Sequence, residues 1–154
     1  MAQLALCFPL GKVEWSFRAK QHDVARQQVN TTPQSPLEVA ARYVDLANRH
    51  DVASLVAMLA RPCDMFGETI TSEAVEWYFS QYQDVRFLIT KPFQLAAGDP
   101  YTVEFEYIRS WKQGDQWVQV EAGEFMTFTT GEPLIARIGY TRPPSDPVAL
   151  PEWY

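Results

Sequence analysis

Tyr43 is a candidate for a hydrogen bond to a ligand, because the residues around it predict that its side chain is enclosed. At about 100° per residue, the charged residues of this stretch fall on one narrow strip of a helix: Glu38, Arg42, Asp45 and Arg49. Apolar residues cover the rest of the helix, and Tyr43 lies near the middle of that arc. A buried tyrosine needs a partner for its hydroxyl. That partner is either a structural hydrogen bond or a ligand, and the sequence leaves both open.

Glu124 is a second candidate, because it lies on the same side of a predicted strand as Met126 and Phe128. If those two side chains face a cavity, the Glu124 carboxyl faces it too. Burial among such neighbours disfavours the charged form and raises the pKa of a carboxyl. The carboxyl could then donate a hydrogen bond or act as a base near neutral pH. A bulge at Gly123 would instead turn it to solvent, and of these two orientations we favour the pocket.

Arg109 is the charged residue whose place is hardest to assign. It shares its strand parity with Phe105 and Tyr107. Its guanidinium either lines the mouth of a cavity and holds an anionic ligand, or it pairs with a glutamate at the surface. Glu106 and Glu121 are the surface partners available to it, and we favour this surface pair.

Three helices are predicted ahead of the strands. The first begins with a capping box formed by Ser35 and Glu38, and Pro36 suits its first helical position. Asp51 then caps a second helix, which Pro62 ends.

A mixed apolar and acidic loop is expected at 63–69, and a third helix begins near 71–72. After this helix the apolar period changes to that of β-strands. Four antiparallel strands are predicted, over 85–89, 103–107, 117–130 and 134–142. This order indicates an α+β fold in which the helices cover one face of the sheet. A long strand bent at Gly123 would curve the sheet and leave a conical pocket beneath it.

Composition places the chain among globular proteins with one domain of 154 residues, since 47% of its residues are hydrophobic and 14% are aromatic. Threonines and prolines at 31–36 form a boundary signal. We therefore expect a partly ordered N-terminal extension at 1–34, a domain at 35–142 and a proline-rich tail at 143–154.

Charge and cysteine content limit the classes of partner. The net charge is −6 and the chain has no cluster of lysines or arginines, which argues against a nucleic acid or an anionic membrane as partner. No apolar run reaches the length of a membrane span. Cys7 and Cys63 lack metal-ligand spacing and are expected to be free thiols in the cytoplasm. The two histidines lie far apart, so we expect no metal site.

Several short motifs, taken in their order and spacing, resemble the nuclear transport factor 2-like (NTF2-like) superfamily. This superfamily includes nuclear transport factor 2, the SnoaL-type polyketide cyclases and the ketosteroid isomerases. The motifs are Arg42-Tyr43-Val44 followed by Asn48, Asp51 and the run at 55–60, then Phe105-Glu106-Tyr107, Glu124-Phe125-Met126-Thr127-Phe128 and the stretch at 134–140. The resemblance implies a cone of three helices packed on a curved antiparallel sheet of about four to six strands. It also implies a homodimer paired through the sheets and a site without a cofactor.

The resemblance assigns roles to particular residues. Tyr43 matches the tyrosine and Glu124 the protonated acid that form the oxyanion hole of the isomerases. The catalytic base of those enzymes does not carry over, because Gly67 occupies its position with Asp64 and Glu68 on either side. Asp64 is taken as the candidate base, although capping a turn is the role its position favours. The residues expected to contact an apolar ligand are Phe66, Tyr78, Phe87, Phe105, Tyr107, Met126 and Phe128.

Two functions follow from this interpretation. In the first, the protein is an isomerase-type or cyclase-type enzyme that transfers a proton on an apolar carbonyl compound. Tyr43 polarises the carbonyl, Glu124 assists, and Asp64 or Glu68 is the base. In the second, it is a non-catalytic module that binds a hydrophobic small molecule or another protein. Both predict a homodimer, for which the sequence offers Trp111 and Trp117 near a turn and Val118 and Val120 on one strand face.

Overall fold

The computed structural model describes residues 34–81 and 84–152 of the chain. The predicted extension at 1–34 lies outside the described residues, apart from Gln34, and so does Cys7. The described elements are α1 (Pro36–Asn48), α2 (Val52–Ala57), β1 (Leu59–Met65), β2 (Glu68–Ile70), α3 (Ser72–Gln81), β3 (Arg86–Ala96), β4 (Asp99–Gln113), β5 (Gln116–Phe128), β6 (Ile135–Arg142) and β7 (Val148–Ala149). These elements confirm the predicted α+β class.

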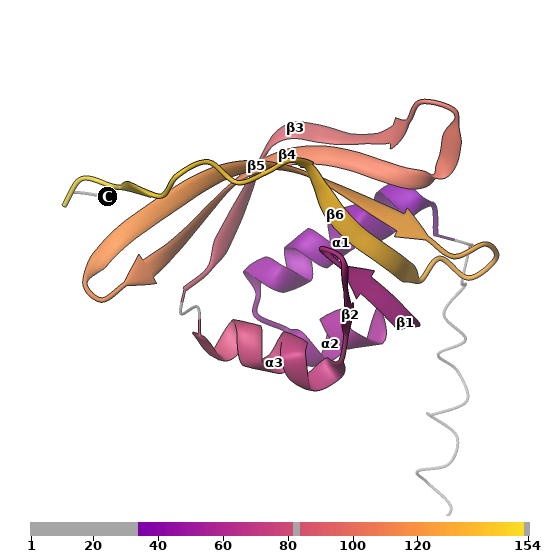
Figure 1. The fold of residues 1–154 in the computed structure, drawn as a ribbon, viewed down its shortest axis with the longest axis horizontal. Helices are drawn as coiled ribbons and strands as arrows, with labels where there is room; N and C mark the ends of the chain where they lie inside the picture. The colour runs from indigo at the N-terminus through magenta and orange to yellow at the C-terminus, as the bar shows by residue number, and fades with distance from the viewer. Residues whose placement is uncertain (1–33, 82–83, 153–154) are drawn as a thin grey trace, which may run out of the picture. The chain divides into compact units, whose positions relative to one another are not determined.

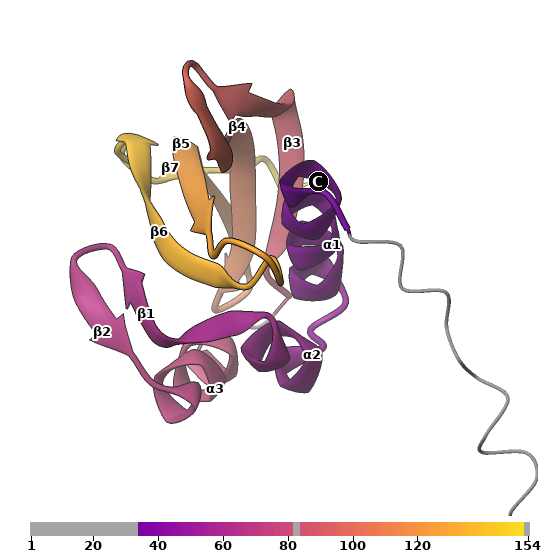
Figure 2. The ribbon, with the colours of Figure 1, turned by 90° about the vertical axis from the view of Figure 1, so that its right-hand side faces the viewer.

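One curved sheet contains all of these strands, in the order β2-β1-β6-β5-β4-β3, with β7 paired to β5. β1 runs parallel to β6 while the other neighbours are antiparallel, so the sheet is mixed and not purely antiparallel as predicted. The long strands β3, β4 and β5 arch over α1 (Figure 1), which packs against β3 and β4. Figure 2 shows α2, α3, β1 and β2 together below the long strands.

The start of α1 has the capping box that the sequence predicts. The backbone N–H of Ser35 donates to the Glu38 carboxylate at 2.8 Å, and the N–H of Glu38 donates to the Ser35 hydroxyl at 3.3 Å. The helix buries one face through Val39, Ala40, Val44, Leu46 and Ala47. No helix in the described part of the chain is long and apolar enough to cross a membrane.

The segment at 63–69, predicted as a loop, belongs to a β-hairpin formed by β1 and β2. α2 ends at Ala57, and Pro62 lies within β1 instead of ending a helix. Phe66 and Gly67 form the turn, with φ angles of 57° and 89°. β1 is held by parallel pairing with β6, a strand far along the chain, so local periodicity could not reveal it. The helices therefore do not all precede the strands, contrary to the prediction.

β5 carries the bulge that the sequence predicts at Gly123. Its pairing with β6 shifts register between Gly123 and Glu124, while its pairing with β4 stays regular there. A Cβ at position 123 would lie 2.5 Å from the Thr141 hydroxyl oxygen, so the close approach requires glycine. Beyond the bulge Glu124 remains buried, on the same face as Met126 and Phe128. Of the two orientations that the sequence allowed for Glu124, the structure therefore has the one toward the interior.

The proline-rich tail pairs with the free edge of β5 instead of leaving the sheet. The Ser145 N–H donates to the Glu121 carbonyl at 2.9 Å, and the Leu150 N–H donates to the Trp117 carbonyl at 2.8 Å. Between these two contacts β7 pairs with β5. The tail therefore covers backbone groups of β5 that β6 does not reach.

The homodimer stays a prediction, but two of the residues offered for it are placed elsewhere. Val118 and Val120 are only 7% and 3% exposed, so their side chains are buried within the chain. Trp117 is half-buried, with the Arg86 guanidinium 4.7 Å from the centre of its ring.

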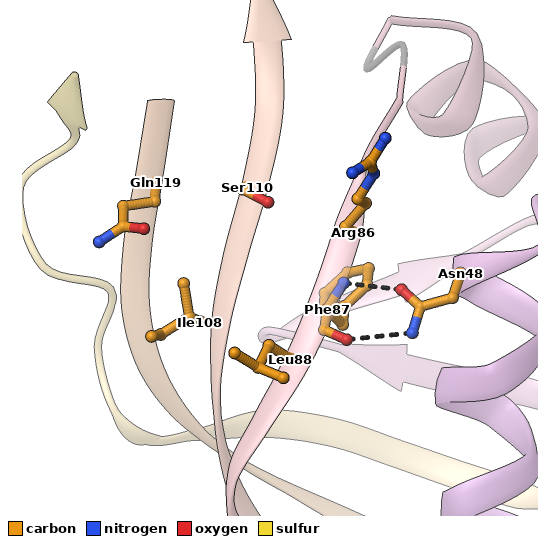
Figure 3. A pocket seen from close by; sticks show the side chains of 7 residues that line it. All are labelled: Asn48, Arg86, Phe87, Leu88, Ile108, Ser110 and Gln119. Atoms are coloured by element: carbon orange, nitrogen blue, oxygen red, sulfur yellow. Dashed lines mark hydrogen bonds between the residues drawn. The ribbon is translucent and has the colours of Figure 1, made fainter. Parts of the chain in front are cut away.

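Asn48, the last residue of α1, binds the edge of the sheet through its side chain. Its amide nitrogen donates to the Phe87 carbonyl at 3.0 Å, and its amide oxygen accepts from the Phe87 N–H at 2.7 Å (Figure 3). The side chain thus makes the two bonds that a neighbouring strand would make to β3. This contact joins the helix that carries Tyr43 to the strand that carries Phe87.

Replacing Asn48 by alanine removes both of these bonds. We expect the Asn48→Ala variant to lower the free energy of unfolding by about 1–2 kcal/mol, because each net hydrogen bond contributes roughly 1 kcal/mol. Urea unfolding followed by circular dichroism measures this. Gln94→Ala, a change of an exposed amide on β3, is the matched control. Equal stabilities of the two variants would contradict a role for Asn48 in holding α1 to the sheet.

Candidate functional site

A pocket of about 380 Å³ lies between the helices, the hairpin and β3. Its size falls within the roughly 300–1,000 Å³ that is usual for small-molecule sites. The polar residues that line it are Tyr43, Tyr78 and Glu68. The remaining lining residues are Ala47, Met65, Phe66, Ile70, Ala74, Val75, Phe79 and Phe87. The pocket is therefore apolar with a few polar groups that could orient a ligand.

Tyr43 contributes to the pocket from the middle of α1. Its pKa is raised, first by burial and then by the nearby charge of Glu124 and by Tyr78 and Cys63. The hydroxyl therefore keeps its proton and is a hydrogen-bond donor. Within residues 34–81 and 84–152 it makes no hydrogen bond. Of the two partners that the sequence left open, a structural one is not found in the described residues, and Tyr43 lines a pocket.

Glu124 lies behind the pocket wall and bonds to Tyr107. Its side chain is 7% exposed, and its carboxylate oxygen Oε2 accepts from the Tyr107 hydroxyl at 2.9 Å. Burial raises the pKa of Glu124 to about 7, and the Tyr107 hydrogen bond and the positive charge of Arg109 oppose this rise in part. The Tyr107 pKa is raised in turn, by burial and by the Glu124 charge. The Glu124 carboxyl therefore changes its ionisation near neutral pH.

The predicted ligand-contacting residues divide into two groups. Phe66, Tyr78 and Phe87 line the pocket. The other four are 0–3% exposed and belong to the hydrophobic core: Phe105, Tyr107, Met126 and Phe128. These four side chains thus fill space beneath the sheet, and the open space lies nearer the hairpin and α3.

The two candidate bases differ in position. The Asp64 carboxylate accepts from the Gly67 N–H at 2.9 Å and so closes the β1–β2 turn, which is the capping role its position favours. Asp64 does not line the pocket, whereas Glu68 of β2 does. Glu68 is therefore the carboxylate in position to contact a bound molecule.

Arg109 does not form the surface ion pair that we favoured. Glu106 and Glu121 instead bind Arg142, at 3.1 Å and 3.7 Å. Arg109 is half-buried on the inner face of β4, and its Nη1 donates to the Tyr78 hydroxyl at 2.9 Å. Strand parity placed its side chain on the correct face, but the partner lies on α3, which sequence spacing alone could not bring to β4.

Tyr140 is a further site residue that the sequence analysis did not select. It stands opposite Glu124 in the pairing of β5 with β6. Its ring stacks on Phe66 with centroids 4.3 Å apart and planes inclined by 26°. The strand alternation of β6 is the signal that could have placed Tyr140 beside the buried Ile138 on the inner face. The stack connects the hairpin turn to the sheet at the edge of the pocket.

A larger hollow of about 520 Å³ lies on the outer face of the sheet (Figure 3). Arg86, Ser110 and Gln119 form a row across β3, β4 and β5 there, beside the 64% exposed Leu88. Asn48 at its edge is already bound to the β3 backbone. None of the inner-face tyrosines lines this hollow, so we assign the chemistry to the inner pocket. No cluster of three His, Cys, Asp or Glu that could hold a metal ion occurs in the described residues.

The raised pKa of Glu124 predicts a specific pH dependence of stability. An acid whose pKa is higher in the folded protein than in the unfolded chain stabilises the fold at low pH, and this contribution is lost as the pH rises through the folded pKa. Glu124→Gln removes this titration. Between pH 5 and pH 8 we therefore expect the original protein to lose roughly 2–3 kcal/mol more stability than the variant.

Urea unfolding of both proteins at the two pH values measures this difference. Glu104→Gln, a half-buried glutamate on the outer face of β4, serves as control and should follow the original protein. Parallel pH profiles for the original protein and Glu124→Gln would show that Glu124 is ionised and solvated as in a free chain.

No protein-family model matches the chain, and no curated protein matches it. Its structure, however, is similar to solved structures. A proposed polyketide cyclase from Pseudomonas putida has a TM-score of 0.55 and 16% identity, with 71% of this chain and 92% of that chain covered. The epoxide hydrolase/cyclase-like enzyme SalBIII, which is described for pyran ring formation in the polyether salinomycin, has a TM-score of 0.58 and 18% identity, covering 68% and 89%.

A computationally designed 17-OHP binder is also similar, with a TM-score of 0.58 and 14% identity, covering 71% of this chain and 92% of that chain. At identities this low, the likeness shows the fold alone. Together with the curved mixed sheet and the helices beneath it, these structures show that the chain has the cone-shaped α+β fold of the NTF2-like superfamily.

Proposed function

We propose that this protein binds an apolar carbonyl compound in the inner pocket and transfers a proton on it without a cofactor. One observation carries the proposal: Tyr43, whose protonated hydroxyl makes no hydrogen bond inside the described residues, lines an apolar pocket and lies near the charge of Glu124. Such a donor is suited to a carbonyl oxygen. The aromatic lining suits a polyketide-like, terpenoid or steroid-like framework.

The proton transfer uses two groups of the pocket wall. The Glu68 carboxylate takes the proton from the carbon next to the carbonyl, and the C–H electron pair forms a C=C bond as the carbonyl oxygen becomes an enolate. That oxygen accepts a hydrogen bond from Tyr43, which stabilises the developing negative charge. Glu68 then returns the proton to a carbon of the same framework, so the base is restored and no other reactant is consumed.

Glu124 acts through Tyr43 and not on the ligand, because it does not line the pocket. An ionised Glu124 raises the pKa of Tyr43 and so weakens it as a donor. A protonated Glu124 removes this effect. Glu124 is therefore a positioning residue that adjusts the donor strength of Tyr43 around neutral pH.

The similar structures support chemistry on molecules of this kind. Two of them are described as a proposed polyketide cyclase and as an epoxide hydrolase/cyclase-like enzyme. The designed 17-OHP binder supports the use of this fold for holding a small molecule. These descriptions agree with the class of ligand that the lining residues favour.

A non-catalytic ligand-binding module is the second candidate. The observation in its favour is that Glu124 and Tyr107 bind each other behind the pocket wall. Among the described lining residues, the one carboxylate is Glu68, which is exposed. In this case the pocket would hold its ligand without changing it.

Exchange of α-protons separates the two candidates. With 2-tetralone in D2O, we expect the protein to catalyse deuterium incorporation and Tyr43→Phe to lower the rate roughly 100-fold, as is typical for loss of an oxyanion donor. Proton NMR follows both the exchange and the binding of the ketone. Tyr101→Phe, a change of a 43% exposed tyrosine outside the pocket, is the matched control. Binding without exchange would favour the non-catalytic module, and absence of binding would contradict both candidates.

A further inference from the structure

We propose that Phe66, in the turn of the β1–β2 hairpin, makes the inner pocket select ketones that carry a planar aromatic ring over saturated ketones with the same carbon skeleton. The inference rests on the proposed function of this pocket and adds the residue that determines its specificity. The backbone conformation of Phe66, the contacts that hold the turn and the exposure of its side chain all support this role.

The backbone of Phe66 has a conformation that is unfavourable for phenylalanine. Its φ angle is 57°, in the left-handed region, where bulky residues are rarely found. The other non-glycine residues with a positive φ in the described part of the chain are His50 and Asp84, whose types are enriched in that region. A two-residue hairpin turn with a positive φ at both positions favours asparagine or aspartate before the glycine. Phenylalanine at position 66 therefore costs backbone energy, and strained residues of this kind cluster at ligand-binding sites.

Three contacts hold the turn in this conformation. The Phe66 N–H donates to the Ile138 carbonyl at 2.8 Å, and the Gly67 N–H donates to the Asp64 carboxylate at 2.9 Å. The Phe66 ring also stacks on the Tyr140 ring, with centroids 4.3 Å apart. The ring is therefore fixed in position before a ligand binds, so binding against it does not have to order a mobile side chain.

The Phe66 side chain keeps surface that a ligand can cover. Phe66 lines the pocket and is 45% exposed. The other two phenylalanines of the pocket lining, Phe79 and Phe87, are half-buried and pack against the hydrophobic core. An apolar side chain that is exposed in the free protein has the most surface to withdraw from water when a ligand binds. Phe66 is therefore the phenylalanine of the pocket whose ring a ligand covers most.

Contact between two aromatic rings distinguishes ligands that apolar burial alone does not. Stacked and edge-to-face ring pairs are stabilised beyond the burial of their area, and a saturated ring has no π system with which to form such a pair. A saturated skeleton is also the more apolar of the two, so burial alone would favour it. Preference for the aromatic ketone therefore indicates an aromatic contact, which a merely apolar wall would not provide.

A pair of ketones with the same bicyclic skeleton tests the inference. 2-Tetralone contains a benzene ring and trans-2-decalone does not, and isothermal titration calorimetry measures the affinity of the full chain for each. We expect 2-tetralone to bind about fivefold more tightly, the order of preference that one aromatic ring pair supplies. Phe66→Leu, which keeps an apolar side chain, should remove this preference and leave the affinity for trans-2-decalone within about twofold.

Two variants should keep the preference. Phe66→Tyr retains the aromatic ring, and Trp77→Leu removes a 64% exposed aromatic side chain of α3 that lies outside the described lining of the pocket. If Phe66→Leu does not fold, Phe66→Asn, which suits the left-handed backbone, takes its place with the same expected loss of preference.

A preference that persists without the Phe66 ring would assign the aromatic contact to another residue and overturn the inference. Equal affinities of the original protein for the two ketones would also overturn it, while leaving the apolar pocket of the proposed function intact. Failure of both ketones to bind would contradict the proposed function itself, and the inference with it.

Discussion

The burial of the Glu124 carboxyl group determines which groups must lie around it on the inner face of the sheet. Glu124 sits in a core of aromatic and aliphatic side chains, where an ionised carboxylate without partners would be very costly. The Tyr107 hydroxyl satisfies one of its oxygens, and burial keeps the group neutral over the acidic range of pH. Strand parity, which Glu124 shares with Met126 and Phe128, sets the direction of the side chain. Burial raises the pKa of Tyr43 in the pocket wall, and the charge of Glu124 adds to this rise.

The pocket lies where large side chains leave space beneath the sheet unfilled. Large side chains from β4, β5 and β6 pack into one core beneath the sheet, as the near-complete burial of Phe105, Met126 and Ile138 shows. Space remains where α3 and the hairpin meet the sheet, because α3 buries fully only Val75. The Arg109–Tyr78 hydrogen bond joins α3 to the sheet at this point. Tyr78, which lines the pocket, therefore also connects α3 to β4.

Interactions between residues that are close in the sequence made much of the fold predictable. The capping box at Ser35, the cap at Asp51 and the alternation of β5 are signals within a few residues, and the structure confirms them. The inward orientation of Glu124 also followed from parity. The β1–β2 hairpin was missed because parallel pairing with a distant strand stabilises it. The partner of Arg109 was missed for the same reason, since only the folded chain brings α3 to β4.

The most direct test of this account is the ionisation of Glu124 itself. Carbon-13 NMR of the side-chain carboxyl groups follows each glutamate through a pH titration, and the Glu124 resonance is identified by its absence in Glu124→Gln. The account predicts a midpoint of about 7 for this resonance. A midpoint near the ordinary value of 4.5 would contradict it, because the carboxyl would then be solvated and could not adjust the Tyr43 donor in the pocket.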